Sequence, residues 1–433
     1  MQKVLVLGSG IAGMAASLAL KKQYGSEIDI CILEKTSHPG GLLLGSNLKG
    51  YAIDNGCYMY RWDSSLAQLY PENFRDASFT WRVWLNKRII AFPPNYHTIL
   101  QPQALTTKVL AILHMLWGRV IANIFPPLNA REWLYQSLGR KMIELTHLDI
   151  YLNKLQGRDA STIHPYLCDN RIDSLRQPLW QIFKRQFLVK FLTQPKTPSK
   201  SITCYPKGGT KALINNLYEE CLTKGIAFVF DCSIKQISTQ ESGFVVQTAD
   251  QSYASEQLYS SIPLAEILSY LPNDPILQAF PIPQYTTMHA HKLLLKTINF
   301  ASDIYVLYSF EEKHLWKRCT CVRQEDGYYT AVVEVNLALS LDPNSKESLR
   351  QNIIAELANE IKLFDIQDLI ADEMITVANA YPVIGVESWE QIISLKNYLE
   401  EHYHFKLMGR QGIHDYLSSV QSWEQAVKRV HNR

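Results

Sequence analysis

The chain has 433 residues and a formal net charge of +2, with 47% apolar and 19% charged residues. This is the balance of an ordinary globular protein, long enough for two domains with separate cores. A charge so close to neutral argues against a protein that holds nucleic acid through a strong basic field, so we expect no nucleic-acid partner. The eight cysteines show neither CxxC spacing nor a cluster with histidines and carboxylates. This predicts reduced thiols, no metal site and a cytoplasmic location. The first apolar run begins almost at the first Met, so we expect no signal peptide.

The N-terminal segment has the pattern of a strand, a tight turn and a helix. Lys3 to Leu7 is an apolar run, and Gly8, Gly10 and Gly13 follow it with GxGxxG spacing. In such a turn the first glycine allows the bend, the second lets a pyrophosphate approach the backbone, and the third lets the helix pack closely on the strand. The amides at the helix N-terminus then point toward the phosphates, together with the positive end of the helix dipole.

A second strand is expected from Ile28 to Leu33, and it ends at Glu34. An acid about twenty residues beyond the glycine turn bonds the ribose hydroxyls in folds of this kind. A carboxylate there also repels a 2′-phosphate, which disfavours NADP. These features together predict a dinucleotide-binding βαβ unit. The alternative is a helix N-terminus with incidental glycines.

Gly40 and Gly41 follow Glu34 within the segment HPGGLLLG. This spacing resembles that of FAD enzymes of the amine oxidase group, in which a Gly-Gly loop returns to the pyrophosphate. Further segments resemble, nearly end to end, the superfamily that contains amine oxidases, protoporphyrinogen oxidases and UDP-galactopyranose mutases. These segments are residues 50–56 (GYAIDNG), 86–94 (NKRIIAFPP), 132–157 (EWLYQSLGRKMIELTHLDIYLNKLQG) and 205–210 (YPKGGT).

The C-terminal segment resembles the mutase-like branch of that superfamily. It reads AYPV at residues 380–383, then a helix to about Glu401, a strand around residues 405–408, and Gly409 with Arg410. In that branch the strand brings Gly-Arg to the flavin phosphates, and Tyr416 falls where the mutases place a tyrosine on the substrate's phosphate. The resemblance therefore implies FAD as the cofactor and a small-molecule substrate, with a nucleotide sugar as one option.

From these patterns and this resemblance, we expect two groups of site residues. The cofactor-binding residues are Gly8, Gly10, Ile11, Ala12, Gly13, Glu34, Lys35, Gly40, Gly41, Leu42, Asp54, Ile234, Gly409 and Arg410. The substrate-binding residues are Tyr58, Arg171 and Tyr416, and Lys184 with Arg185 is a further candidate for a phosphate clamp. Basic residues on solvated helices are the alternative for these last positions. No catalytic residue and no metal ligand is assigned.

Three segments depart from the family pattern. In one of them, Tyr285-Thr286-Thr287 stands where the mutases have an arginine after a tyrosine. Where the family has Asp-x-Gly-x-His, with the His near the flavin ring, the chain carries Cys57 and Tyr58 at the end of Asp54-Asn55-Gly56-Cys57-Tyr58. Residues 417–420 (LSSV) replace the Asn and Asp that usually follow the tyrosine. These replacements bear on the mutase reaction more than on flavin binding, which depends on backbone amides, Glu34 and Arg410.

We predict an α/β chain in which a discontinuous Rossmann-type FAD-binding domain carries an inserted α+β substrate domain. The FAD-binding domain comprises residues 1–80, 200–265 and 370–433. The substrate domain comprises a helical part at 81–199 and a strand part at 266–369. Within the strand part we expect strands at 292–296, 304–310 and 328–335 and a helix at 345–362.

One segment raises the question of a membrane. Residues 108–125 (KVLAILHMLWGRVIANIF) are mostly apolar, but His114, Arg119 and Asn123 interrupt them. The segment is too short and too polar for a comfortable bilayer span. A buried or interfacial helix is favoured, and a peripheral membrane contact is the alternative.

Three functions stay open. The first is an FAD-dependent, oxidoreductase- or mutase-like flavoenzyme that acts on a nucleotide-linked sugar or related substrate in surface-polysaccharide biosynthesis, by nucleophilic or hydride chemistry at flavin N5. The second is an amine- or porphyrinogen-type FAD oxidase that uses O₂, with Trp62, Trp81, Trp84 and Trp133 as candidate walls of an apolar pocket. The third is a flavin-binding partner protein that has lost catalysis. The substrate, the electron donor or acceptor and the oligomeric state are not determined by these patterns.

Overall fold

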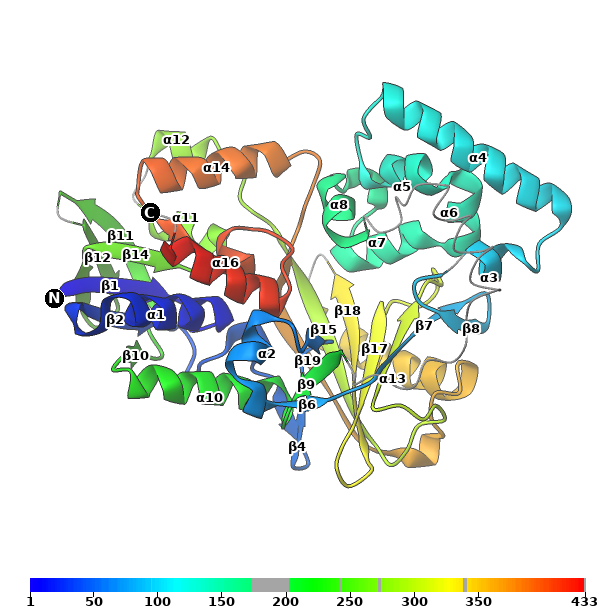
Figure 1. Ribbon diagram of the computed structural model, residues 1–433, viewed down its shortest axis with the longest axis horizontal. Helices are drawn as coiled ribbons and strands as arrows, with labels where there is room; N and C mark the ends of the chain where they lie inside the picture. Colours follow the sequence, from blue (N-terminus) through cyan, green and yellow to red (C-terminus); the bar gives the residue numbers. More distant parts are fainter. Residues whose placement is uncertain (95, 173–201, 242, 272–273, 338–340, 432–433) are drawn as a thin grey trace.

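The computed structural model describes residues 1–433 except 95, 173–201, 242, 272–273, 338–340 and 432–433. The candidate clamp residues Lys184 and Arg185 therefore lie outside the described residues. The described chain contains a parallel sheet with its covering layers on one side and a second, larger sheet with a group of helices on the other (Figure 1).

The parallel sheet has β1 (Gln2–Leu7) at its centre. Strands β2 (Ile28–Leu33) and β10 (Ala227–Val229) follow on one side, and β14 (Gln257–Ser260) and β20 (Lys406–Leu407) follow on the other. All four pairings are parallel. These strands come from three distant parts of the chain, so the predicted α/β fold class with a discontinuous Rossmann-type sheet is confirmed.

The side chains of β1 alternate between the two faces of this sheet. Val4 and Val6 pack toward one side, and Leu5 and Leu7 pack toward the other. The first side is covered by three helices, α1 (Ile11–Tyr24), α10 (Gly209–Thr223) and α16 (Ser419–His431). The second side is covered by an antiparallel sheet and two helices, namely β11 (Ile234–Gln240), β12 (Gly243–Thr248), β13 (Ser252–Ser255), α11 (Leu264–Tyr270) and α14 (Trp389–Glu401).

The second sheet has seven strands in the order β19-β15-β18-β17-β16-β7-β8. Their bounds are β7 (Phe79–Leu85), β8 (Arg88–Ala91), β15 (Tyr285–Leu295), β16 (Ile304–Ser309), β17 (Arg318–Arg323), β18 (Tyr329–Leu337) and β19 (Leu369–Pro382). All neighbours are antiparallel except β7 and β16. The three predicted strands correspond to β15, β16 and β18, whereas β17 and β19 were not predicted.

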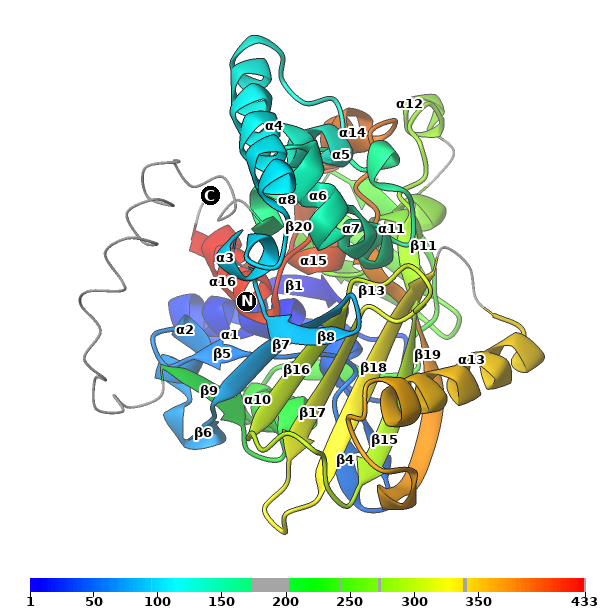
Figure 2. The same cartoon turned by 90° about the vertical axis from the view of Figure 1, so that its right-hand side faces the viewer.

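Different helices pack on the two faces of the seven-stranded sheet (Figure 2). One face packs against α13 (Pro343–Ala355), which starts near the predicted helix and continues as a π-helical turn to Glu360. The other face packs against four helices, α5 (Ala130–Leu138), α6 (Arg140–Thr146), α7 (Leu148–Gln156) and α8 (Tyr166–Ile172). Along β17, Val322 packs on the face with the helices and Cys321 packs on the face with α13. Because side chains alternate along a strand and Arg318 lies four residues before Val322, Arg318 points to the face with the helices.

The apolar segment at 108–125 forms most of α4 (Leu105–Ile124). Only Ala111, Met115 and Gly118 of this helix are buried. Of the two options expected for this segment, a buried helix is therefore wrong, and an interfacial helix stays a prediction. The helix lies against α5 and α6 at the outer edge of the molecule.

The ranges given for the two domains stay a prediction. Strand β19 spans the boundary predicted between residues 369 and 370, and β7 spans the one between residues 80 and 81. Both strands belong to the seven-stranded sheet.

Candidate functional site

A groove of about 360 Å³ lies where β1, β2 and the C-terminal segment end. Eleven of the predicted cofactor residues line it: Gly8, Gly10, Ile11, Ala12, Glu34, Lys35, Gly40, Gly41, Leu42, Gly409 and Arg410. Segments far apart in the chain therefore meet at one edge of the parallel sheet. This edge is where α/β folds of the Rossmann type bind dinucleotides.

Glycines let the chain segments around the groove approach one another. Gly8 has φ +92°, and a Cβ at Gly13 would lie 2.0 Å from the carbonyl oxygen of Gly8. A Cβ at Gly409 would lie 2.5 Å from the Cβ of Ala12, and this residue also has φ +68°. The C-terminal segment therefore packs against the first turn of α1 without a side chain between them.

Glu34 is buried at the end of β2 with its carboxylate held in place. One oxygen accepts hydrogen bonds from the backbone N of Ser9 (2.8 Å) and the Ser9 Oγ (2.6 Å). The other accepts from the backbone N of Thr36 (2.9 Å) and the Thr36 Oγ1 (2.8 Å). The carboxylate is thus oriented at the groove before any ligand binds, and Ser9 and Thr36 already use the two lone pairs of each oxygen.

Three of the predicted cofactor residues do not line the groove, namely Gly13, Asp54 and Ile234. Gly13 supports the turn from behind, as described above. The buried carboxylate of Asp54 accepts from the hydroxyl of Tyr205 (2.5 Å) and from the backbone N and Oγ1 of Thr210 (2.9 and 2.8 Å). Burial raises the pKa of Asp54 above its ordinary value. Through its hydrogen bonds to Thr210, Asp54 stabilises the turn at the start of α10.

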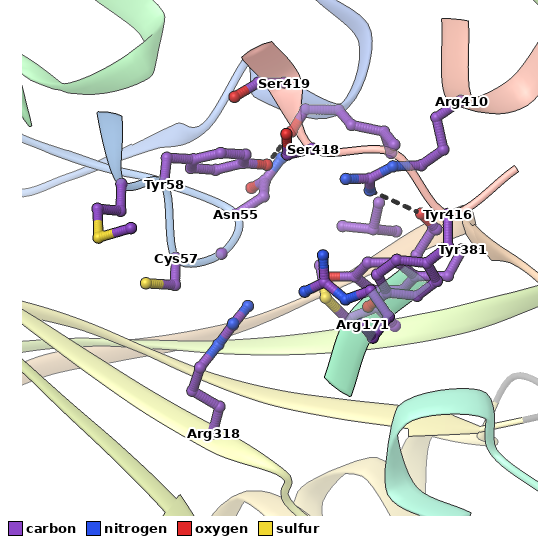
Figure 3. A pocket seen from close by; sticks show the side chains of 16 residues that line it. Asn55, Cys57, Tyr58, Arg171, Arg318, Tyr381, Arg410, Tyr416, Ser418 and Ser419 are labelled. Carbon is purple, nitrogen blue, oxygen red and sulfur yellow. Dashed lines mark hydrogen bonds between the residues drawn. The ribbon is translucent and has the colours of Figure 1, made fainter. Parts of the chain in front are cut away.

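A second cavity adjoins the groove, and Leu42, Tyr58, Val377, Arg410 and Ser419 line both. All three predicted substrate residues, Tyr58, Arg171 and Tyr416, lie on its wall (Figure 3). The other lining residues are Asn55, Gly56, Cys57, Met59, Met288, Arg318, Ala380, Tyr381 and Ser418. The described lining therefore contains three arginines and no carboxylate.

A pair of stacked tyrosines organises the cations of this cavity. The rings of Tyr381 and Tyr416 are stacked, and the guanidinium of Arg171 lies 4.7 Å from the centroid of Tyr416. The guanidinium of Arg410 lies 4.9 Å from the centroid of Tyr381, and Lys317 Nζ lies 4.2 Å from it. Burial raises the pKa of both phenols, so the hydroxyls stay protonated at neutral pH.

Arg318 is held by Glu334, which is fully buried on the neighbouring strand β18. The guanidinium meets one carboxylate oxygen at 2.5 and 2.7 Å, and Lys317 Nζ lies 3.0 Å from the other. Burial pushes the pKa of Glu334 upward, but the charges of Arg318 and Lys317 outweigh it and lower the pKa to about 2. The carboxylate is therefore ionised and fixes the position of Arg318 in the cavity wall.

Lys292 supports the loop that carries the residues between groove and cavity. Its buried Nζ donates to Ser46 Oγ (2.7 Å), Asn55 Oδ1 (2.8 Å) and the carbonyl of Ile53 (3.2 Å). Burial lowers the pKa of Lys292 to about 8. Tyr58, which stands where the family pattern has a histidine, lies in the same loop. Cys57 precedes it, and burial raises the pKa of its thiol.

The sequence patterns missed several of these residues. Arg318 starts β17, a strand that was not predicted, and Lys317 precedes it. The alternation of Arg318 and Thr320 with Cys319 and Cys321 was the only signal. Tyr381 belongs to the AYPV segment, whose resemblance was noted without assigning the tyrosine a role. The four tryptophans proposed as pocket walls, Trp62, Trp81, Trp84 and Trp133, line neither cavity.

Comparisons with known sequences agree with this geometry. The family model described as an NAD(P)-binding Rossmann-like domain matches residues 6–70. A 1-hydroxycarotenoid 3,4-desaturase of Flavobacterium sp. (strain P99-3) is 37% identical over 256 residues, which are 55% of this chain and 51% of that protein. The match thus spans about half the length of this relative.

Solved structures match the whole chain. A reduced UDP-galactopyranose mutase has a TM-score of 0.79 at 15% identity, with 99% of this chain and 93% of that chain covered. The chain shares the Rossmann-like fold of this structure. A protoporphyrinogen oxidase structure from Exiguobacterium sp. 255-15 has a TM-score of 0.73 at 14% identity, covering 99% and 98% of the two chains. A putrescine oxidase bound to putrescine has a TM-score of 0.64 at 12% identity, covering 100% and 98%.

The shared fold agrees with the resemblance predicted from the sequence, and it leaves the reaction open. At these identities the structures show the fold alone. The groove fits the dinucleotide that such a fold implies, because glycine backbone, the oriented carboxylate of Glu34 and the guanidinium of Arg410 all line it.

Proposed function

We propose that the chain is an FAD-dependent enzyme whose substrate carries a phosphate or diphosphate group, with a nucleotide-linked sugar as the substrate class. The observation that carries this proposal is the cavity beside the dinucleotide groove, where Arg171, Arg318 and Arg410 meet the stacked pair of Tyr381 and Tyr416. Guanidinium groups bind phosphate oxygens through paired hydrogen bonds, and buried phenols add neutral donors. Surface-polysaccharide biosynthesis is the setting in which such a substrate is expected.

The residues of the groove would hold FAD along its length. The backbone of the Gly8–Gly10 turn and the N-terminus of α1 would face the pyrophosphate, and Glu34 would face the ribose hydroxyls. Arg410 lies at the junction of groove and cavity, so its charge is available to phosphate on either side. Bound FAD would supply hydride or nucleophilic chemistry at its N5 position.

The protein's own groups divide between binding and positioning. Arg171 would bind the anionic group of the substrate, since within the described residues it has no carboxylate at salt-bridge distance and packs on Tyr416. Arg318 is already paired with Glu334 and would present its remaining N–H donors to the cavity. Tyr58, whose hydroxyl donates to the carbonyl of Leu42 (3.1 Å), would fix the loop next to the flavin ring.

The test is a titration of the purified, FAD-loaded protein with UDP-galactose, UMP and free galactose, followed by the flavin absorbance spectrum. We expect UDP-galactose to shift the flavin bands and free galactose to leave them unchanged. The variant Arg171→Ala should weaken this binding by roughly ten-fold or more, since a charged hydrogen bond is lost. The matched control is Arg140→Ala, an exposed arginine on α6 that pairs with Glu144. A spectrum that no nucleotide or nucleotide sugar perturbs would overturn the proposal.

A second candidate is the oxidation of an apolar substrate, and one observation favours it. The carotenoid desaturase of Flavobacterium matches this chain at 37% identity over 256 residues. In this case the flavin would be reduced by the substrate under anaerobic conditions, and Arg171→Ala would leave that rate unchanged. If the chain is instead an oxidase of amines or porphyrinogens with O₂ as the electron acceptor, the assay would measure the release of hydrogen peroxide.

A further inference from the structure

Helix α4 presents a broad apolar face to the outside of the molecule. Trp117 is 65% exposed and Leu113 is 55% exposed, although both side chains are large and apolar. The exposed face continues along the whole helix through Leu105, Val109, Leu110, Ile112, Leu116, Val120 and Ile124. Phe125 and Leu128 extend it beyond the helix, where they line a hollow with Ile121 and Pro126. Soluble proteins rarely leave so large a contiguous apolar surface uncovered.

The opposite side of α4 is fastened to the protein. A Cβ at Gly118 would lie 2.5 Å from the carbonyl oxygen of Tyr135, and a Cβ at Gly139 would lie 2.5 Å from the backbone N of Met115. The backbones of α4 and of the corner between α5 and α6 are therefore in close contact. By length and composition alone α4 is the one helix among the described residues that could cross a membrane. Its packing on charged helices such as α6, which carries Arg140 and Lys141, means that it lies flat on the protein.

Cations predominate in the sequence around α4. Residues 77–131 contain no aspartate or glutamate, whereas the whole chain contains nearly equal numbers of acids and bases. Glu132, which lines the hollow, directly follows this stretch. The cations of this stretch are Arg82, Lys87, Arg88, Lys108, Arg119 and Arg131. With 3.6 residues per turn, Lys108 and Arg119 fall together at the border between the packed side of α4 and its apolar face. Apolar residues bordered by cations, with a tryptophan among them, are typical of helices that lie in the interface of an anionic membrane.

We propose that α4 docks the protein on the surface of a bilayer that contains anionic phospholipid, with its apolar face in one leaflet. The helix stays packed on α5 and α6, and its axis lies parallel to the membrane. Trp117 sits at the level of the lipid headgroups and acyl boundary, and Lys108 contacts headgroup phosphates. This proposal is independent of the proposed reaction, because it rests on a surface outside the groove and the cavity.

The test is flotation of the full chain with vesicles of phosphatidylcholine plus phosphatidylglycerol and with vesicles of phosphatidylcholine alone. We expect strong binding to the first, weaker binding to the second, and a decrease of the first with added NaCl. The triple variant L113Q/L116Q/W117Q should lower the bound fraction by roughly ten-fold or more. A matched control, L69Q/L315Q/I366Q, changes three similarly exposed residues elsewhere and should bind like the unmodified chain.

Two further variants test the two components of the surface separately. Lys108→Glu should reduce binding to anionic vesicles more than binding to neutral ones. Phospholipid brominated in the acyl chain should quench part of the tryptophan fluorescence, and Trp117→Phe should remove that quenched part. No binding of the unmodified chain to anionic vesicles would overturn the proposal. So would a dimer in solution that the L113Q/L116Q/W117Q variant dissociates, because a second copy would then cover this face.

Discussion

Tyr381 and Tyr416 stack with their ring centroids 4.9 Å apart and their planes inclined by 8°. Tyr381 lies near the end of β19, and Tyr416 follows the short helix α15 (Gly409–Gly412), so the stack joins the seven-stranded sheet to the segment that closes the groove. Cations lie 4.2 to 4.9 Å from the ring centroids of this pair. Each such contact contributes about 0.5–2 kcal/mol, so the aromatic pair holds the arginines in place ahead of a ligand.

Two substitutions of Tyr416 separate the contribution of its ring to stability from the contribution of its hydroxyl to substrate binding. Tyr416→Phe keeps the stack, so the free energy of unfolding should change by less than about 1 kcal/mol, whereas Tyr416→Ala leaves a cavity and should lower it by about 3–5 kcal/mol. Urea unfolding measures both. If the hydroxyl binds substrate phosphate, Tyr416→Phe should also weaken UDP-galactose binding by roughly ten-fold, as seen in flavin difference spectra. Unchanged affinity in the Phe variant would show that the hydroxyl makes no such contact.

Removal of the charge of Glu334 should destabilise the protein strongly. Glu334→Gln leaves Arg318 and Lys317 as buried cations without their counterion, which costs about 3–5 kcal/mol of unfolding free energy. The control is Glu325→Gln, since Glu325 is exposed in the turn after β17. A loss as small as that of the control would mean that the two cations find other partners or water.

The free energy of unfolding should depend on pH through the ionisation of Glu334. The pKa of Glu334 is about 2 in the folded protein, compared with an ordinary value of 4.5. Because the folded-state pKa is lowered, the stabilisation from this group is complete above pH 4.5 and is lost as the pH falls toward 2. The total is about 3 kcal/mol. The difference in unfolding free energy between the unmodified chain and Glu334→Gln should therefore narrow as the pH falls below 4.5. A gap that is constant with pH would contradict the assigned ionisation.

A side chain at Gly409 should close the groove to its cofactor. Gly409→Ala forces a Cβ within 2.5 Å of the Cβ of Ala12 and at a φ of +68°. The two segments must then separate, so we expect FAD affinity to fall by roughly ten-fold or more, measured by reconstitution of the apoprotein with FAD. Gly225→Ala is the matched control, because Gly225 also has positive φ (+71°) but open space around it. Equal FAD affinity in both variants would contradict the prediction, because the contact of residue 409 with α1 would then not affect the groove.

The dinucleotide-binding unit could be predicted because its parts are neighbours in the chain. Gly8 and Gly10 form the turn after β1, Glu34 and Gly41 follow the end of β2, and local backbone geometry brings them to one groove. The resemblance of the C-terminal segment then placed Gly409 and Arg410 at the same groove. Asp54 shows the limit of such transfer, because the structure directs its carboxylate to Tyr205 and Thr210 instead.

By itself, then, the sequence determined the α/β class, the glycine turn with its acid, and the presence of an apolar helix near residue 115. Only the tertiary structure decided that Arg171, Arg318 and Arg410 share one cavity, because three separate elements must pack before these side chains meet. It also decided that α4 has an open face. Periodicity reports which residues of a helix are apolar, but the close contact of Gly118 with α5 selects the side that packs and leaves the other side uncovered.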